Sequence, residues 1–260
     1  MIQPLAYIHP SAKIARHVNI DPFVTIHEDV EIGHGTHIMS GVTIFKGSRV
    51  GSNCTIFPGA SIGAIPQDLK YEGENTLTII GNNTIIREYV TINKGTKASG
   101  VTTVGNNVLL MAYVHLAHDV VVEDHCILAN SVQVAGHVLI GEWAIVGGGA
   151  MVHQFVKIGR HSMVSGGSLV RKDVPPYTKA AREPISYEGV NSVGLRRRGY
   201  TIEKTTEIQD IYRILFVKGY NTTTAIKIIE TEFSPTTERD EILQFIKDSD
   251  RGIMKGYIGK

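Results

Sequence analysis

Aliphatic residues recur at every sixth position over most of this chain. The longest unbroken series runs from Val104 to Val170, and a small or β-branched residue lies four positions after each member. An amphipathic helix repeats every 3.6 residues and a simple strand every two, so a period of six indicates neither. The members of this series are Val104, Leu110, Leu116, Val122, Leu128, Val134, Ile140, Val146, Val152, Ile158, Val164 and Val170.

The period of six predicts a coil of very short strands. The small residue and the next aliphatic are two positions apart, so both point to the same face of a strand. Three sides of six residues would close a triangular coil of eighteen. Stacked coils would pair all their strands in parallel and bury one continuous aliphatic core. The sequence therefore predicts a mainly β protein, a parallel β-helix.

Two segments interrupt the repeat. Hexads run in one phase from Ile8 to Ile62, resume for three hexads from Ile80, and begin again at Val104. Residues 63–79 and 93–103 are polar and contain glycine, so they are predicted to be loops that leave the coil. Loops that interrupt a solenoid usually carry function.

The repeat is predicted to end at Pro175 and Pro176, where the composition changes. The residues beyond are rich in Arg, Lys, Glu and Thr at helical spacing. The chain should therefore consist of a β-helix over 1–185 and a C-terminal α-helical domain over 186–260. Helices are predicted over 189–198, from an N-cap at Thr201 to about Lys218, over 222–232, and from Thr236 to about Asp248.

Composition removes several classes of function. The net charge of +1 makes non-specific binding to nucleic acid a poor default. Both cysteines, Cys54 and Cys126, fall on small core positions, which favours packing over a disulfide or a metal site. The chain shows no leader-like start and no apolar run of the roughly 18 residues that a membrane span needs. We therefore expect no membrane span and a cytoplasmic location.

The candidate chemistry lies on one ladder of the predicted coil. Residues eighteen apart should lie one above another, about 4.8 Å apart. His118, Gly136 and Gln154 have that spacing, and His137 is one position off it. Asp119 adjoins His118 and could fix its tautomer and stabilise the imidazolium. We therefore predict a polar cluster at one edge, whereas His9 and the other N-terminal histidines are expected to be solvated or packed.

Six motifs carry a resemblance to a known family. They are QDLKY (67–71), HLAHD (115–119), AGHV (135–138), VHQF (152–155), KDVPPY (172–177) and GVNSVGLRRRGY (189–200). In this order they resemble the UDP-N-acetylglucosamine O-acyltransferases of the hexapeptide-repeat superfamily. Two departures are visible: Val193 stands where the family often has an acidic nucleotide contact, and residues 180–187 are unlike the commoner versions.

The resemblance implies a left-handed coil, a homotrimer with sites at subunit interfaces, and the first step of lipid A biosynthesis. That step moves a 3-hydroxyacyl chain from acyl carrier protein to the 3-hydroxyl of UDP-N-acetylglucosamine. No resident cofactor or metal is expected, because the acyl chain arrives on the phosphopantetheine of the carrier protein. Loop 63–79 must reach a histidine edge some three coils away, so we expect it to cover the site of a neighbouring subunit.

The resemblance also assigns residues. His118 would be the general base, an imidazole being suited to that task near neutral pH, and Gly136 the oxyanion donor. The sugar and its diphosphate would be held by Asp68, Lys70, His115, His137 and Gln154, and the uridine and phosphate by Asn191, Arg197 and Arg198. Arg196 is left for carrier-protein docking. Asn130, Gly148 and Gly166 would line an acyl groove beside the His118 edge, with Gly166 as the ruler for chains of fourteen carbons or more.

Three alternatives remain open from the residues. A trimeric metalloenzyme of the γ-carbonic anhydrase type shares the predicted fold, but no two histidines here lie five apart, as its ligand pair requires. A purely structural β-helix would not need a polar cluster and two loops. A related N-acyltransferase, or an acetyl-CoA-dependent enzyme, is nearer. We expect an N-acyltransferase to carry an additional N-terminal domain, whereas the hexads here begin at Ile8.

Overall fold

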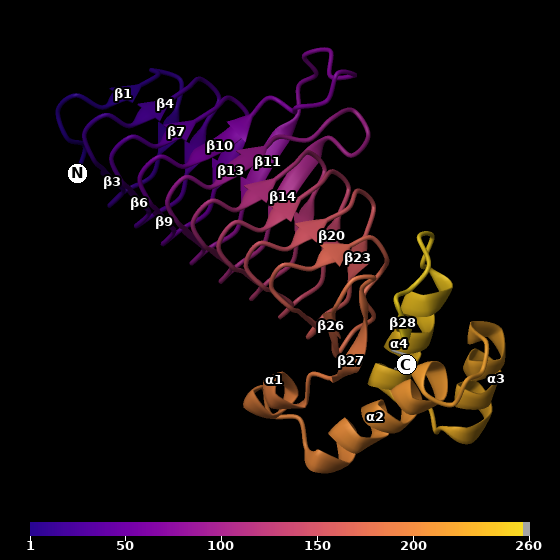
Figure 1. Cartoon of the computed structure of the whole chain (residues 1–260). Coiled ribbons are helices and arrows are strands. Elements are labelled where there is room, and N and C mark those ends of the chain that lie inside the picture. The colour runs from indigo at the N-terminus through magenta and orange to yellow at the C-terminus, as the bar shows by residue number, and fades with distance from the viewer. Residues whose placement is uncertain (257–260) are drawn as a thin grey trace.

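The computed structural model of the protein describes residues 1–256 and forms a tapering stack of triangular coils with helices at one end (Figure 1). Every aliphatic sixth position lies on a short strand, from Ile8 on β1 (Tyr7–Ile8) to Val170 on β25 (Leu169–Val170). The strands form three sheets, one for each side of the coil. The predicted parallel β-helix is therefore the observed architecture.

The first sheet has the order β1-β4-β7-β10-β13-β16-β19-β22-β25 and the second β2-β5-β8-β11-β14-β17-β20-β23. The inner strands of the first are β4 (Thr25–Ile26), β7 (Thr43–Ile44), β10 (Ser61–Ala64), β13 (Thr91–Asn93), β16 (His115–Leu116), β19 (Gln133–Val134) and β22 (Met151–Val152). Those of the second sheet are β2 (Lys13–Ile14), β5 (Glu31–Ile32), β8 (Ser48–Val50), β11 (Leu77–Ile80), β14 (Val101–Val104), β17 (Val121–Val122), β20 (Leu139–Ile140) and β23 (Lys157–Ile158).

The third sheet begins with coils of the same kind, spaced by eighteen residues, and ends in the C-terminal region. Its order is β3-β6-β9-β12-β15-β18-β21-β24-β26-β27-β28. Its strands are β3 (Asn19–Ile20), β6 (His37–Ile38), β9 (Thr55–Ile56), β12 (Ile85–Ile86), β15 (Leu109–Leu110), β18 (Ile127–Leu128), β21 (Ile145–Val146), β24 (Met163–Val164), β26 (Thr178–Ala181), β27 (Ser186–Val190) and β28 (Lys255–Gly256).

The register matches the predicted coil of eighteen residues. Leu116 pairs with Val134, and Val134 pairs with Val152, in parallel. Leu116 and Val134 are fully buried, as are most of the aliphatic sixth positions and their small partners. Burying an aliphatic side chain is worth roughly 1.5–3 kcal/mol, so this column supplies most of the stabilisation of the coil.

Most corners of the coil turn through one residue with a positive φ, three positions after the aliphatic. Asp119 and His137 (both φ 60) occupy this position, as do Gly149 (φ 68) and Gly167 (φ 69). We name the three edges for one residue each. The His118 edge follows the first sheet (117–120, 135–138, 153–156), the Trp143 edge follows the second (123–126, 141–144, 159–162), and the Gly148 edge follows the third (129–132, 147–150, 165–168).

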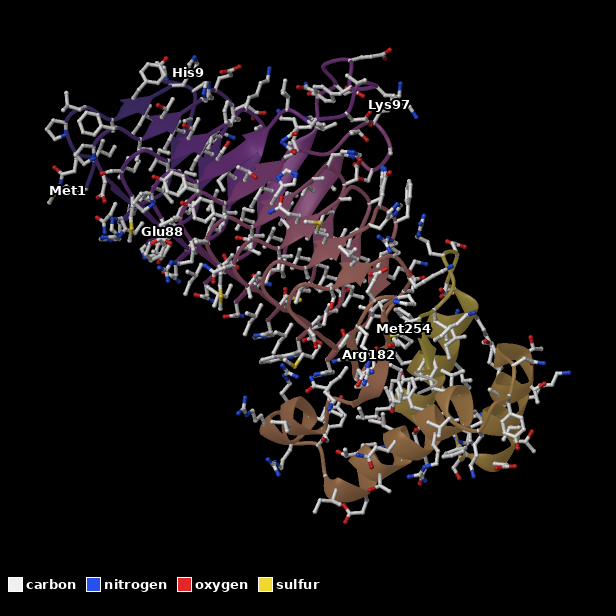
Figure 2. The ribbon with its side chains drawn as sticks, in the orientation of Figure 1. Met1, His9, Glu88, Lys97, Arg182 and Met254 are labelled. Carbon is white, nitrogen blue, oxygen red and sulfur yellow. The ribbon has the colours of Figure 1, made fainter. Side chains whose placement is uncertain are left out.

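Both predicted loops leave the coil, and both leave it at the His118 edge, between the first and second sheets. They are shorter than predicted, covering 65–76 and 94–100. The flanking residues remain in strands, because β11 pairs with β14 along its whole length, from Leu77 opposite Val101 to Ile80 opposite Val104. Lys97 lies at the outer part of the second loop (Figure 2).

The prolines do not end the coil, contrary to the prediction. The chain continues through Pro175 and Pro176 to β26, which pairs in parallel with β24. Proline removes a donor only where a ladder hydrogen bond needs one, and these two lie at a corner. β26 then forms an antiparallel hairpin with β27, and β28 pairs with β27. These last strands have no hexad period in the sequence, and the hairpin crosses residue 185, where the two domains were predicted to meet.

Three of the four helices agree with the sequence pattern, whereas the first begins at Ser192 and not at 189, because Gly189 and Val190 belong to β27. The bounds of the helices are α1 (Ser192–Arg197), α2 (Ile202–Phe216), α3 (Thr222–Glu232) and α4 (Thr237–Lys247). Thr201 caps α2 by accepting a hydrogen bond from the Lys204 N–H, as predicted. Ile208, Ile211 and Leu215 of α2 are buried in the core of the helical region.

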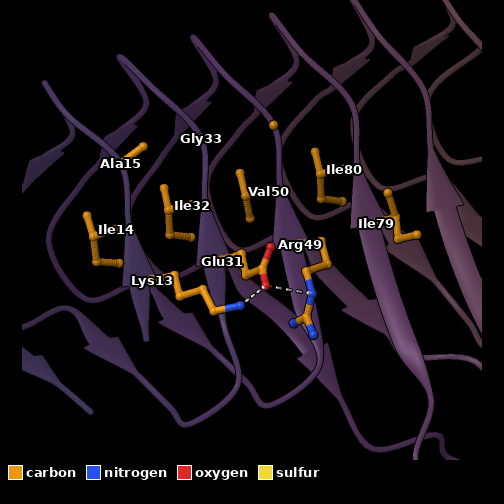
Figure 3. Close-up of a pocket in the computed structure, with 11 residues that line it drawn as sticks. Lys13, Ile14, Ala15, Glu31, Ile32, Gly33, Arg49, Val50, Ile79 and Ile80 are labelled. Carbon is orange, nitrogen blue, oxygen red and sulfur yellow. Dashed lines mark hydrogen bonds and ion pairs between the residues drawn. The ribbon is translucent and has the colours of Figure 1, made fainter. Parts of the chain in front are cut away.

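The outer faces of the sheets differ along the stack. The N-terminal coils of the second sheet carry a charged ladder, in which Glu31 pairs with Lys13 at 2.9 Å and with Arg49 at 3.8 Å above a shallow pocket (Figure 3). Farther along, the third sheet presents a continuous apolar ladder on its outer face. This ladder consists of Ile85, Leu109, Ile127, Ile145 and Met163.

Candidate active site

His118 and Asp119 form a buried, hydrogen-bonded pair at the His118 edge. The Nδ1 of His118 lies 2.8 Å from an Asp119 carboxylate oxygen, and the two side chains are 10% and 0% exposed. A carboxylate can only accept here, so Nδ1 carries the proton and Nε2 has a free lone pair in the neutral imidazole. The pair therefore has the geometry of a general base with an orienting carboxylate.

The Asp119 carboxylate is held by residues of loop 94–100. Thr96 donates its backbone N–H at 3.0 Å and its hydroxyl at 2.6 Å, and the Ser99 hydroxyl donates a third, short hydrogen bond. Burial alone would raise the pKa of this carboxyl group, but the hydrogen bonds from Ser99, Thr96 and His118 outweigh it and lower the pKa to about 2. Asp119 is therefore ionised at any physiological pH.

Gly136 lies directly above the imidazole on the next coil. A Cβ built on Gly136 would come within 2.6 Å of the His118 Cε1, so any side chain there would displace the ring. Within residues 1–256 the Gly136 N–H donates no hydrogen bond, and its carbonyl accepts one from Phe155 at 3.2 Å. A free backbone N–H beside a base is what an oxyanion site requires.

The other predicted residues of this edge surround the pair. His137 stands edge-on to His118 at 5.0 Å between ring centroids, and its Nε2 lies 3.7 Å from Asp119. His115 lies on β16, just before the edge, where its Nδ1 is 2.7 Å from the Thr91 hydroxyl and burial lowers its pKa. Gln154, half-buried, occupies the next coil above Gly136.

Loop 65–76 brings Asp68 to the same place within one chain. An Asp68 carboxylate oxygen lies 3.9 Å from the His118 Nε2, too far for a direct hydrogen bond. The expectation that this loop serves only a neighbouring subunit is therefore wrong for Asp68. The loop reaches the pair because the two excursions leave the same edge, and Asn93 ties its base by donating to the Ile65 carbonyl at 2.9 Å.

Lys70 has a different position from Asp68. Its backbone N–H donates to the Asp68 carboxylate at 3.0 Å, which turns the loop, while the residue itself is exposed. The structure therefore places Lys70 near the opening of the cluster and leaves its predicted contact to the diphosphate as a prediction.

The cluster also contains the ligand types of a metal site. One donor atom each of His118, Asp119 and His137 lies within 4.8 Å of the others. However, Asp119 already accepts hydrogen bonds from a neighbouring imidazole, two hydroxyls and a backbone N–H. A metal would have to displace several of them, so these residues suit proton transfer better than coordination.

The residues predicted to bind the nucleotide lie on the Trp143 edge. The Arg198 guanidinium stacks over the Trp143 ring at 4.9 Å, and its buried Nη1 has no hydrogen-bond partner among residues 1–256. Arg197 is exposed. Asn191 uses both ends of its amide within the chain: it donates to the His161 carbonyl at 2.9 Å and caps α1 by accepting from the Gly194 N–H.

The predicted acyl groove lies on the third edge. Asn130, Gly148 and Gly166 do stack on successive coils, and a Cβ on Gly166 would meet the Gly148 carbonyl oxygen at 3.0 Å. They belong to the Gly148 edge, however, so the prediction that they run beside His118 is wrong within one chain. The spacing of eighteen correctly predicted that these three residues stack. However, each side of the coil has six residues, so a ladder displaced by six residues from His118 and Gly136 lies on a different edge.

Sequence reasoning missed the supports of Asp119. Thr96, Ser99 and Thr102 all hydrogen-bond Asp119, the last by accepting its backbone N–H at 2.8 Å. The hydroxyl residues inside the second excursion were the available signal.

Comparison with known proteins identifies the family of this chain. The family of bacterial transferase hexapeptide repeats matches residues 11–46, 23–58 and 102–136. The family of the second domain of UDP-N-acetylglucosamine O-acyltransferases matches residues 173–254. The chain is similar to the acyl-(acyl-carrier-protein)–UDP-N-acetylglucosamine O-acyltransferase of Sulfurihydrogenibium, with 49% identity covering 97% of this chain and 93% of the relative. The enzyme of that name from Thermodesulfovibrio yellowstonii is 42% identical over 98% and 99%.

Solved structures agree. The UDP-N-acetylglucosamine acyltransferase from Bacteroides fragilis superimposes with a TM-score of 0.97 at 49% identity, covering 98% of this chain and all of that one. The fold is thus the left-handed parallel β-helix of the hexapeptide-repeat acyltransferases. Within that class, the chain belongs to the family of acyl-(acyl-carrier-protein)–UDP-N-acetylglucosamine O-acyltransferases.

Proposed function

We propose that this protein transfers a (3R)-3-hydroxyacyl chain from acyl carrier protein to the 3-hydroxyl of UDP-N-acetylglucosamine, the first step of lipid A biosynthesis. The observation that carries the proposal is the buried His118–Asp119 pair beneath Gly136, in a chain of this family. The full-length relatives carry the O-acyltransferase name, which favours this function over the N-acyltransferase and γ-carbonic anhydrase alternatives.

His118 acts as the general base. Its Nε2 accepts the proton of the sugar 3-hydroxyl as that oxygen attacks the thioester carbon, and Asp119 stabilises the imidazolium that forms. The 3.9 Å gap between Nε2 and Asp68 leaves room for neighbouring hydroxyls of one sugar, each donating to one of these acceptors. The proton on His118 then passes to the leaving thiolate.

Gly136 stabilises the developing charge on the thioester oxygen. Its free N–H is pre-oriented by the corner backbone, and the absence of a side chain lets the reacting carbon approach. His137 and Gln154, above the pair on the same edge, are placed to hold the sugar, and His115 lies beside them on β16.

The acyl donor brings its own carrier group. We infer that the thioester is presented on the phosphopantetheine of acyl carrier protein and that the enzyme needs no resident cofactor. The exposed Arg196 on α1 is assigned to docking of the acidic carrier protein. Among the helices of the described chain, none is long and apolar enough to cross a membrane, and we propose a cytoplasmic location.

The complete site is built from two subunits of a homotrimer. The base, the candidate nucleotide residues and the candidate groove lie on three different edges of one prism, and each side of six residues is up to about 20 Å long. One chain therefore cannot present all three to one small substrate. The apolar ladder Ile85–Met163 on the third sheet is at the level of these edges and is a face suited to association.

The proposal is tested by incubating the purified protein with UDP-N-acetylglucosamine and a panel of acyl carrier protein thioesters. The panel carries 3-hydroxyacyl chains and unsubstituted acyl chains, and the products are identified by mass spectrometry. The expected product is the 3-O-(3-hydroxyacyl) nucleotide sugar, and acyl-CoA should be a poor donor. An N-acylated product would contradict the proposal. It would also be contradicted if none of the acyl carrier protein thioesters served as a donor.

A further inference from the structure

Loop 94–100 has no role in the mechanism above, yet it contacts Asp119 more closely than any other segment. Three of its donors converge on one carboxylate: the Thr96 N–H, the Thr96 hydroxyl and the Ser99 hydroxyl. Thr96 is itself 7% exposed. Thr96 is also bonded within the loop: its hydroxyl accepts from the Ala98 N–H at 3.3 Å, and its carbonyl accepts from the Gly100 N–H at 2.8 Å.

The loop is fixed to the coil at both ends. At one end Lys94 donates its backbone N–H to the Ala64 carbonyl at 2.9 Å, and at the other end the Gly100 carbonyl accepts from the Leu77 N–H at 2.9 Å. These hydrogen bonds hold the loop in one conformation against Asp119. They therefore fix both the direction of the Thr96 and Ser99 hydroxyl dipoles and the position of the Asp119 carboxylate.

We propose that Thr96 and Ser99 are positioning residues, which hold the Asp119 carboxylate against His118 and set how strongly that carboxylate attracts the proton of the base. This inference rests on the proposed function, because it concerns the same base. Hydroxyl dipoles point their positive ends at Asp119 and so offset part of its negative charge. With that charge offset, the imidazolium gains less from Asp119, and His118 gives up its proton more readily.

The same hydrogen bonds also bear on geometry. The Thr96 and His118 bonds share one carboxylate oxygen, while the Thr96 N–H and Ser99 bonds share the other. The carboxylate plane is thus held from both sides, and the Nδ1 contact cannot rotate away. Losing the hydroxyls should therefore affect both the orientation of the base and its titration.

Few other charged groups face this pair. Asp68 lies 3.9 Å from His118 on the substrate side, and His137 lies 3.7 Å from Asp119 on the next coil. Lys97 and Glu72, from the two loops, pair with each other at 3.5 Å farther out. None of these groups changes when a hydroxyl of loop 94–100 is removed, so a titration shift in such a variant comes from the lost dipole.

The test compares Thr96→Val, Ser99→Ala and the double variant in full-length protein. The pH profile of kcat/KM for UDP-N-acetylglucosamine should show its acid limb, which reports protonation of the base, moved upward by about half a pH unit for each hydroxyl removed. Thr96→Ser keeps the hydroxyl and should restore the parental limb. Thr103→Val removes a hydroxyl on β14 that does not bond Asp119, and it should leave the limb unchanged.

The outcomes separate positioning from mere structure. If the variants keep the parental thermal midpoint and lose activity equally at all pH values, the loop is only structural and the proposal fails. If the folded double variant keeps both the parental rate and the parental limb, the proposal also fails. An NMR titration of histidine-labelled protein follows the His118 imidazole without substrate, and its midpoint should move upward in the double variant. That readout tests the loop even if the assigned substrates prove wrong.

Discussion

The His118 edge and the Gly148 edge are built on the same corner, in which the residue three positions after the buried aliphatic has a positive φ. At the first edge the two residues of the corner are His118 and Asp119, and two loops fold over them. At the second they are Gly148 and Gly149, with no loop. The same backbone geometry therefore accommodates either two glycines or a histidine–aspartate pair. The buried His118–Asp119 pair is possible at the first edge because loop 94–100 supplies the hydrogen-bond partners that the buried carboxylate requires.

The largest effect is expected from removing the base. His118→Ala should lower kcat by roughly 10²–10⁴-fold, the usual worth of a positioned general base, while the protein stays folded. The measurement is steady-state turnover together with a thermal midpoint. A folded variant with near-parental turnover would remove His118 from the mechanism.

The second effect uses the same corner position on the two edges. Gly136→Ala places a Cβ 2.6 Å from the His118 ring and should lower kcat by about a hundredfold, because displacing a reacting group by about 1 Å has that cost. Gly148→Ala meets only the Asn130 carbonyl oxygen, at 3.1 Å, and should lower kcat less than about threefold. Equal losses at the two positions would mean that both act through the coil itself.

The third effect concerns selectivity at the Gly148 edge. Gly166→Met should cut activity on chains of fourteen carbons or more and spare ten-carbon chains. Each buried methylene is worth about 0.8 kcal/mol, so excluding four shifts selectivity by roughly 3 kcal/mol, on the order of a hundredfold. The assay is competition between thioesters of two lengths. A trimeric variant with the parental preference would place the groove elsewhere.

The sequence predicted the coil well, because each hexad meets the same constraint. One aliphatic side chain per side must fill a narrow prism, and that requirement is visible at Leu116, Val134 and Val152. The last strands were missed, since β26 to β28 pair without the hexad period. The helix caps followed from local chemistry, as at Thr201.

The site was predictable only along one ladder. A spacing of eighteen correctly brought His118, Gly136 and Gln154 to one edge. The same spacing did not show that the ladder of Asn130, Gly148 and Gly166 lies on a different edge. It also did not predict the path of loop 65–76 after the loop leaves the coil. Asp68 reaches His118 through that loop, and the path of such a loop depends on anchors like Asn93 that have no periodic signature.

We propose that each site takes its base and Asp68 from one subunit and its nucleotide-binding residue Arg198 from another. Mixed trimers test this directly, after inactive variants are dissociated together and reassembled. An equal mixture of His118→Ala and Arg198→Ala should recover activity at low concentrations of the nucleotide sugar, up to about one quarter of the parental level. A complete site needs an intact His118 from one subunit and an intact Arg198 from its neighbour, and each is present independently in about half of the sites. His118→Ala mixed with Asp68→Asn should recover nothing, because both residues belong to one chain. Recovery in the second mixture, or none in verified trimers of the first, would contradict the account.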